Sequence, residues 1–227
     1  QGFNNFRCKR VLAMKETLIN RDGLNSNDSL STYLFLQLEN MLPGGNVKEA
    51  EAYIDSAVKE VELIIGQLVE WNHNGFDKLV SWQYATFLYK LSRLCIKNNL
   101  SKPVTDRLFL LNKTLHGIEL YPQVQLPKYF FLGHTNSAVF SKANYSDYCV
   151  FHQGITIGRN GDKRPTIEKY LVMYPSSMII GNCHVRENTV LSPGVRLIDK
   201  DTPGNCYVFD DGKGGVFFKS IDEIHIS

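Results

Sequence analysis

Apolar residues recur at intervals of three and four between residues 29 and 115, which is the spacing of amphipathic helices. One such segment ends near Met41, before a Pro-Gly-Gly-Asn turn. The longest is expected to form a helix from Val47 to Trp71, and a third helix is expected from Leu79 to Leu94. A short fourth helix is expected from Val104 to Leu111. The N-terminal half is therefore predicted to be mostly α-helical.

The period changes to six in the second half of the chain. A helix has a period of 3.6 residues and a half-buried strand a period of 2, so neither explains this spacing. A solenoid does, because each face of a triangular coil uses six residues and turns one of them inward. We therefore predict a parallel β-helix. The positions expected to point inward are Val139, Tyr145, Phe151 and Ile157, and then Ile167, Met173, Ile179, Val185, Leu191 and Leu197.

A glycine- and charge-rich segment, Gly158–Pro165, interrupts the repeat between its two registers. We expect it to leave the prism as a loop. Loops that project from a rigid scaffold are frequent places for binding residues. Asp162, Lys163 and Arg164 are therefore candidates for substrate binding.

Composition excludes several classes of function. The net charge of +2 is too small to indicate nucleic acid or an anionic membrane as a partner. No apolar run approaches the roughly 20 residues that span a bilayer. The five cysteines lie far apart with no C-x-x-C pair, so we expect free thiols, a reducing cytoplasmic compartment and no metal site.

Several motifs of the second half carry a family resemblance. Their order and spacing resemble those of serine acetyltransferases, a branch of the hexapeptide-repeat acyltransferases, over residues 116–200. The resemblance extends loosely to the helical half, because that family also has an all-α domain there. The motifs are HGIELYP (116–122), LGHTNSAVF (132–140), VFHQGITIG (150–158), GDKRPTIEKYLVM (161–173) and IIGNCHVRENTVLSPGVRL (179–197).

The resemblance implies an α+β chain with two domains. Residues 1–115 would be an α-helical oligomerisation domain, and residues 116–227 a left-handed parallel β-helix with acyltransferase activity and a C-terminal tail. It also implies a homotrimer with active sites between neighbouring prisms, and helical domains that join trimers into larger assemblies; the sequence leaves open a trimer or a dimer of trimers. Acetyl-CoA would be the co-substrate and would lie along the edge of the β-helix.

Acetyl transfer to a hydroxyl needs a base, and histidine suits this task because its ordinary pKa of about 6.5 lies near the working pH. In the motif LGHTNSAVF, His134 matches the catalytic histidine of the family. Glu119 matches the acidic residue that orients this histidine, which is usually Asp in the family. His152 stands where relatives more often have an apolar residue, and we expect it to point outward and to bind the acceptor or serve as an alternative base.

Two departures from the family pattern concern the acceptor. The family usually has Asp before the catalytic histidine, where this chain has Gly133, and a histidine before the loop proline, where it has Arg164. Gly133 thus removes an anion that would pair with an ammonium group of the acceptor. Arg164 adds a cation that suits a carboxylate or phosphate of the acceptor. L-serine stays possible as the acceptor, and a sugar hydroxyl competes with it.

The resemblance also assigns residues to the cofactor. Small residues at prism corners would let the pantetheine arm run close to the backbone, and two cations would meet the phosphates of CoA. The stretch 204–218 differs from the usual small-residue tail of the family, so the resemblance assigns no contacts with CoA to this stretch. The cofactor candidates are Ser176, Ser177, Ser192, Pro193, Gly194, Arg196 and Lys200.

Three functions remain in competition at this point. The leading one is O-acetyl transfer from acetyl-CoA to a small hydroxyl acceptor. The second is N-acetyl transfer to an amino sugar. The third is a non-catalytic β-helix that serves as a scaffold or partner subunit.

Overall fold

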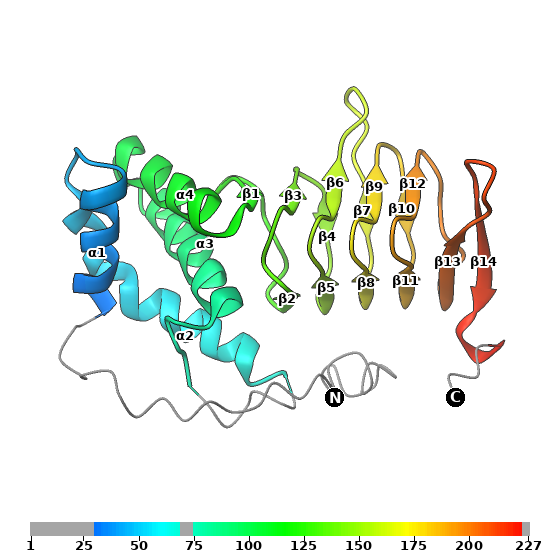
Figure 1. Ribbon diagram of the computed structural model, residues 1–227, viewed down its shortest axis with the longest axis horizontal. Coiled ribbons are helices and arrows are strands. Elements are labelled where there is room, and N and C mark those ends of the chain that lie inside the picture. The colour runs from blue at the N-terminus through cyan, green and yellow to red at the C-terminus, as the bar shows by residue number, and fades with distance from the viewer. Residues whose placement is uncertain (1–29, 69–74, 224–227) are drawn as a thin grey trace.

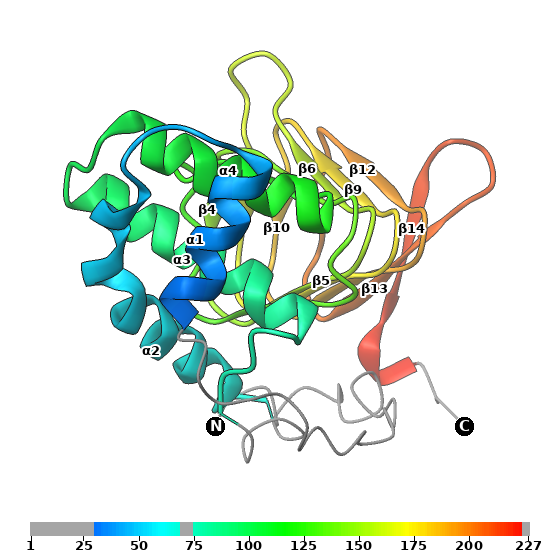
Figure 2. The same ribbon diagram turned by 60° about the vertical axis from the view of Figure 1, so that its left-hand side comes forward.

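The computed structural model describes residues 30–68 and 75–223 of the chain. Its helices form a bundle at one end of an elongated stack of strand coils, as Figure 1 shows. In the turned view of Figure 2, the helices lie in front of the coils, which follow one another like stacked rings. The helical half therefore covers the N-terminal end of the coil stack.

The first helices agree with the predicted pattern but not with its bounds. Helix α1 spans Leu30–Met41, and the 3-10 helix η3 (Val47–Tyr53) leads directly into α2 (Ile54–Ile65). The expected continuous helix over 47–71 is thus wrong at both ends. Its first turns are 3-10, as is common at helix N-termini, and α2 ends at Ile65; residues 69–71 lie outside the described part.

Helix α3 (Ser81–Lys97) is the centre of the bundle, and its contacts are mainly with α2 and α4. Helix α4 (Lys102–His116) is longer than predicted. It ends at Gly117, whose φ of +64° is the left-handed conformation that commonly terminates helices. The apolar pattern of the sequence misses the last turn because that turn buries polar groups, with His116 Nδ1 2.8 Å from Asn112 Oδ1.

The second half forms three sheets whose strands come from successive coils. The sheet orders are β1-β3-β6-β9-β12, β4-β7-β10 and β2-β5-β8-β11-β13-β14. All pairings are parallel except the last, β13 with β14. The chain therefore winds as a parallel β-helix. The strands are β1 (Glu119–Leu120), β2 (Phe130–Leu132), β3 (Val139–Phe140), β4 (Asn144–Tyr145), β5 (Cys149–Phe151), β6 (Thr156–Gly158), β7 (Thr166–Ile167), β8 (Leu171–Met173), β9 (Met178–Ile180), β10 (His184–Val185), β11 (Thr189–Leu191), β12 (Arg196–Ile198), β13 (Cys206–Asp210) and β14 (Val216–Ser220).

The repeat of six marks the interior of this prism. All six positions from Ile167 to Leu197 have exposed fractions of 0%, which confirms the predicted register there. The upstream register is wrong at Val139, whose side chain is 38% exposed. Phe140 is buried instead and pairs with Ile157 in the next coil. The reason is the spacing after β3: Phe140 and Tyr145, which pair with the inward Ile157 and Ile167, are five residues apart rather than six.

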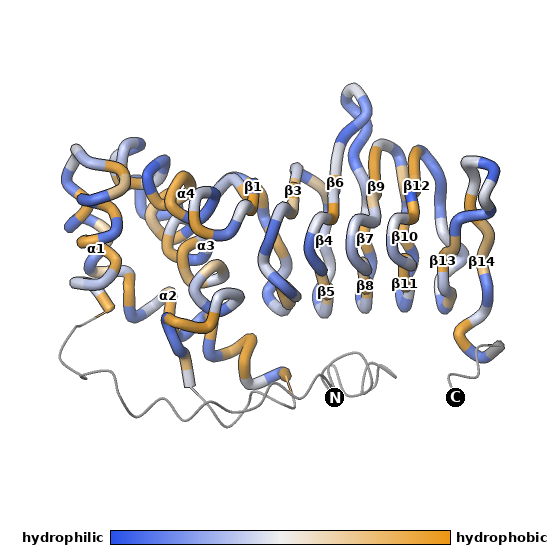
Figure 3. The backbone as a smooth tube through the Cα atoms, in the orientation of Figure 1, coloured by the Kyte–Doolittle hydropathy of each residue, from blue (hydrophilic) through white to orange (hydrophobic). Residues whose placement is uncertain are grey.

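The C-terminal end of the prism carries a feature that the repeat does not predict. Strand β14 folds back on β13 as an antiparallel hairpin. A short 3-10 helix, η4 (Ile221–Glu223), follows it. The tube in Figure 3 is blue at the hairpin turn and mixes orange and blue along its strands. The hairpin therefore ends the parallel stack.

The four cysteines in the described ranges are free and buried, as expected: Cys95, Cys149, Cys183 and Cys206. Burial raises the pKa of the Cys149 thiol to about 12. Within the same ranges, the helices are too short or too polar to cross a lipid bilayer.

Candidate active site

The candidate site lies at the prism corner that follows strands β2 and β5. Leu132 and Phe151, the last residues of these strands, are register partners, so Gly133 and His152 are neighbours across the coils. The Gly133 amide donates to Phe151 O at 2.8 Å, and the His152 amide donates to Met173 O at 3.0 Å. His134 follows with a φ of +51°, which is uncommon for a residue other than glycine, and its side chain is exposed. This conformation turns the imidazole away from the packed prism.

Helix α3 holds this corner from the other side. The hydroxyl groups of Ser81 and Thr135 share a short hydrogen bond, and the rings of Trp82 and Phe131 meet edge to face at 5.1 Å. The two contacts lie on either side of His134 in the sequence. The helical half therefore fixes the turn that carries His134.

The ring of His152 fills the space beside Gly133. A Cβ atom on Gly133 would lie 2.9 Å from Nδ1 and 3.2 Å from Cε1 of His152. On its other side the imidazole stacks on Tyr174, with ring centres 5.2 Å apart and planes 4° from parallel. Tyr174 is a site residue that the sequence analysis missed, because only the register between coils reveals it. The ring is thus held between a glycine backbone and an aromatic face.

The electrostatics of His152 differ from those of an exposed histidine. Burial, and then the nearby His134, lower the pKa of His152 to about 4. The two imidazole rings are 6.1 Å apart. Atom Nε2 of His152 is buried and has no hydrogen-bond partner among the described residues. At neutral pH the site therefore combines an exposed imidazole with a neutral, confined one.

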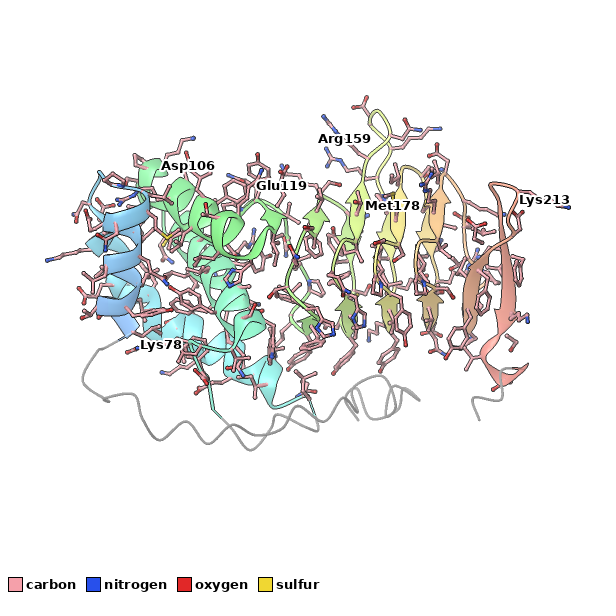
Figure 4. The ribbon with its side chains drawn as sticks, viewed as in Figure 1. Lys78, Asp106, Glu119, Arg159, Met178 and Lys213 are labelled. Carbon is pink, nitrogen blue, oxygen red and sulfur yellow. The ribbon has the colours of Figure 1, made fainter. Side chains whose placement is uncertain are left out.

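Glu119 is placed on β1 in the first coil, as Figure 4 shows. Its carboxylate accepts a hydrogen bond of 2.6 Å from Lys113 Nζ, which raises the pKa of Lys113. Within residues 30–68 and 75–223, no hydrogen bond joins Glu119 to His134. Glu119, which the resemblance assigns to orienting His134, therefore forms an ion pair between β1 and α4 in this structure.

The loop 158–165 projects from the prism between β6 and β7, and Figure 4 marks it at Arg159. Asn160 and Lys163 exchange backbone hydrogen bonds of 3.1 Å across its turn. Strands β3 and β6 are parallel neighbours in one sheet. The loop follows the C-terminal end of β6, whereas His134 lies before the N-terminal end of β3, so the two are at opposite ends of these strands. Within one chain, Asp162, Lys163 and Arg164 therefore do not lie at the corner of His134.

The base of this loop is anchored by a residue that the sequence analysis did not identify. Asn160 Nδ2 donates to Asp199 Oδ2 at 2.7 Å, and the Asn182 amide donates to Asp199 Oδ1 at 2.6 Å. The Asn182 amide and then Asn160 lower the pKa of Asp199. Asp199 therefore ties the loop to two later coils.

The small residues assigned to the cofactor continue the corner of His134 down the prism. Gly154, Ser176 and Gly194 occupy the same left-handed position in three successive coils, with φ between +62° and +74°. Ser176 is exposed, whereas Ser177 is fully buried and donates to Tyr174 O at 2.7 Å. The Ser177 hydroxyl therefore points away from any surface ligand. Ser192 is half-buried, and Pro193 is exposed.

Gly154, Ser176 and Gly194 form a row along this corner, which we call the corner column. A cavity of about 500 Å³ lies at its end. It brings Gly194, Arg196 and Lys200, all predicted for the cofactor, against the hairpin residues Asp210 and Val216. Lys200 Nζ donates to Val216 O at 3.3 Å. Figure 4 marks the tip of the hairpin at Lys213. The unusual C-terminal stretch is thus part of the cationic cavity rather than a separate tail.

Potential metal ligands do not gather in this part of the chain. The described residues contain no group of three or more His, Cys, Asp or Glu side chains placed to hold one ion. His184 pairs with Glu168 at 2.6 Å and His116 Nδ1 lies 2.8 Å from Asn112 Oδ1 in the helical half, so both have structural partners. His73 and His225 lie outside the described residues.

Comparison with solved structures defines the fold. The serine acetyltransferase of Neisseria gonorrhoeae in complex with serine superimposes with a TM-score of 0.64 at 17% identity, over 85% of this chain and 84% of that one. The serine acetyltransferase of Brucella abortus in complex with coenzyme A gives a TM-score of 0.57 at 17% identity, over 83% and 74%. The chain has the fold of the serine acetyltransferases. The predicted layout, an all-α half followed by a left-handed parallel β-helix, is therefore confirmed.

Sequence comparison points to the same proteins. A serine acetyltransferase of Synechococcus elongatus is 31% identical over 140 residues, which are 59% of this chain and 53% of the relative. The chain thus spans about half the length of the curated relative that it matches. No protein-family model matches the chain. The resemblance that the motifs predicted is supported by sequence and by fold.

Proposed function

We propose that the protein transfers the acetyl group of acetyl-CoA to a small hydroxyl acceptor, with His134 as the general base. One observation carries this proposal. The histidine of the LGHTNSAVF motif stands exposed, in a left-handed turn, at the head of a corner column of small residues that leads to a cationic cavity. Similarity in sequence and fold to serine acetyltransferases supports the same reaction.

The proposed chemistry begins at the acceptor hydroxyl. His134 removes its proton while the hydroxyl oxygen attacks the thioester carbonyl carbon, which forms a tetrahedral oxyanion. The oxyanion collapses, the carbon–sulfur bond breaks, and the His134 imidazolium returns the proton to the CoA thiolate. The products are the acetyl ester and free CoA. Glu119 would act as a positioning residue that turns from Lys113 to His134 when substrates are bound.

His152 would bind the acceptor. Because the pKa of His152 is lowered to about 4, its ring is neutral at neutral pH and does not repel the imidazolium that forms on His134. A small shift of the ring would expose its unpartnered Nε2, which can then hydrogen-bond a hydroxyl group. His152 also occupies the space beside residue 133, where an acidic side chain would hold an ammonium group. This substitution favours a sugar hydroxyl over L-serine, and L-serine is the alternative acceptor.

The corner column would hold acetyl-CoA. Adjacent strands lie about 4.8 Å apart, so the three coil steps from His134 to Gly194 cover about 14 Å. An extended pantetheine arm would follow the small residues along this distance, with Ser176, Ser192, Pro193 and Gly194 beside it. Arg196 and Lys200 would meet the phosphates at the cavity.

The loop residues Asp162, Lys163 and Arg164 enter this proposal through a second subunit. They leave the prism at a different corner from His134, so a single chain does not bring the two parts together. In a homotrimer the loop of one chain would reach the corner of its neighbour. Arg164 would then offer a fixed cation to an anionic group of the acceptor.

The experiment that tests this function follows thiol release from acetyl-CoA with a panel of acceptors: L-serine, neutral and acidic monosaccharides, and an amino sugar. We expect acceptor-dependent release with a hydroxyl acceptor and an acetyl ester as the product. An amide formed only with the amino sugar would indicate N-acetyl transfer. Release that no acceptor raises above hydrolysis would support the scaffold alternative.

A further inference from the structure

A second cavity lies in the helical half and contains none of the residues assigned to acetyl transfer. Its volume is about 650 Å³, within the range of small-molecule sites. Helices α2 and α3 and the segment 125–128 before β2 line it. Leu63, Leu94 and Leu126 contribute apolar surface to its wall.

The charges in this cavity are strongly unbalanced. Four basic side chains line it, Lys90, Arg93, Lys97 and Lys128, with Glu60 as the single carboxylate. Three of the four basic residues follow one stripe of α3, because positions three and four apart share a helix face. A chain with a net charge of only +2 thus concentrates cations at one hollow.

Lys90 distinguishes this cluster from a solvated helix surface. Its side chain is only 10% exposed, and its ammonium group pairs with Glu60 at 3.0 Å and lies over the ring of Phe130, 5.5 Å from the ring centre. An ammonium group has three donors, and among the described residues Glu60 is its one hydrogen-bond acceptor, so it can donate to a further acceptor in the cavity. Burying a cation with unfilled donors is unfavourable unless another acceptor is present. The cavity therefore favours an anion.

The walls that carry these cations are fixed in place. Arg93 Nη1 donates to Pro122 O at 2.9 Å, which orients the guanidinium group. Tyr89 Oη donates to Val124 O at 2.8 Å and accepts from the Leu126 amide at 2.9 Å, so α3 holds the segment before β2. These hydrogen bonds hold the walls in place, so an anion could bind without first ordering the side chains around it.

We propose that this cavity is a binding site for small-molecule diphosphates. The seven-residue step from Lys90 to Lys97 covers about 10 Å along the helix axis, more than one phosphate group spans. Two linked phosphates can contact both ammonium groups, and the planar guanidinium of Arg93 suits phosphate oxygens between them. The apolar part of the wall leaves room for an organic group esterified to the diphosphate.

Calorimetric titration with inorganic pyrophosphate at constant ionic strength tests this site. Constant ionic strength is needed because salt screens exposed charges. We expect saturable binding to the wild-type protein, and a Kd about tenfold higher in Arg93→Gln and in Lys97→Gln, since each removes one charge-assisted contact. Lys97 is exposed, so its loss leaves the fold intact.

Two control variants separate this site from other cations. Lys59→Gln removes an exposed lysine of α2 that does not line the cavity, and Arg196→Gln removes a cation of the cavity proposed for CoA. Lys59→Gln is expected to keep the wild-type Kd, and Arg196→Gln is expected to leave unchanged the binding step that Arg93→Gln and Lys97→Gln weaken. Absence of saturable binding would overturn the proposal. So would equal weakening in all four variants, or weakening in Arg196→Gln alone.

Discussion

Gly133 and His152 share one space: a Cβ atom on residue 133 would lie 2.9 Å from Nδ1 of His152. Positions 133 and 152, at both of which this chain differs from the serine acetyltransferase pattern, are therefore one structural feature. An imidazole beside His134 requires glycine at position 133, and a carboxylate at position 133 would displace the imidazole. This exchange sets the charge of the acceptor pocket in our account.

The first prediction concerns this pair. Gly133→Ala should lower the free energy of unfolding by about 1–3 kcal/mol, because the added methyl group overpacks against a stacked ring. In the double variant Gly133→Ala/His152→Ala the cost should be smaller than the sum of the single costs, since the clash is gone. Urea unfolding measures all three values. Gly158→Ala is the matched control, because a Cβ there finds its nearest neighbour at 3.5 Å; a loss as large in this control would contradict the steric argument.

The second prediction is a pH dependence of stability. The pKa of His152 is lowered to about 4 in the folded chain, whereas an unfolded histidine has an ordinary pKa of about 6.5. As pH falls from 6.5 to 4, the unfolded chain takes up a proton that the folded chain does not, so the free energy of unfolding falls. His116, whose pKa burial also lowers to about 4, adds a similar dependence.

His152→Gln isolates the contribution of the site. Its unfolding free energy should fall less steeply between pH 6.5 and 4 than that of the wild type, by at most about 1.4 kcal/mol per pH unit. Urea unfolding at several pH values measures both slopes. Identical slopes would mean that His152 takes up its proton equally readily in the folded chain.

The third prediction assigns Glu119 a positioning role. Glu119→Gln should lower kcat about tenfold or more with little change in KM, because an imidazolium on His134 loses its carboxylate partner. Glu119→Asp should restore part of kcat. Lys113→Met removes the ion pair seen at 2.6 Å and should leave kcat unchanged or higher. If Lys113→Met instead lowers kcat as much as Glu119→Gln, the carboxylate serves the ion pair and not the histidine.

The fourth prediction concerns the loop that leaves the prism away from His134. Variants His134→Ala and Arg164→Ala should each lose most activity alone. Subunits of the two kinds, unfolded and refolded together, should recover about a quarter of wild-type activity, since some interfaces in mixed trimers combine two intact halves. Steady-state thiol release measures the recovery. Mixtures no more active than their parents would place both residues in the same subunit's site or outside it.

The sequence predicts inward positions well and neighbours between coils poorly. Ile167 and Leu197 follow from a local repeat, because one residue per face must fill the prism interior. Which residues stack on each other depends on how many residues each corner contains, and the five-residue step from Phe140 to Tyr145 shifted the phase at Val139. Because corner lengths are not readable from the repeat, the sequence did not reveal that Tyr174 lies beside His152 or that Asp199 lies beside Asn160.

The sequence motifs name some residues of the candidate site, but not the contacts that depend on the register between coils. His134 and the corner residues Ser176 and Gly194 could be named from motifs, and the structure places them along one corner of the prism. Ser177 carries the same small side chain, but only the structure shows that its hydroxyl is buried. The closure of the cationic cavity by β14 depends on an antiparallel pairing, which a repeat of six does not encode.

The most direct test of the account measures thiol release by His134→Asn against His184→Asn. The second variant removes a histidine of strand β10, which pairs with Glu168 at 2.6 Å. With the best acceptor of the panel, we expect His134→Asn to lose at least about 100-fold in kcat, the lower range for general base catalysis, while His184→Asn stays near wild type. Wild-type turnover in a folded His134→Asn protein would contradict the assignment of His134 as the base.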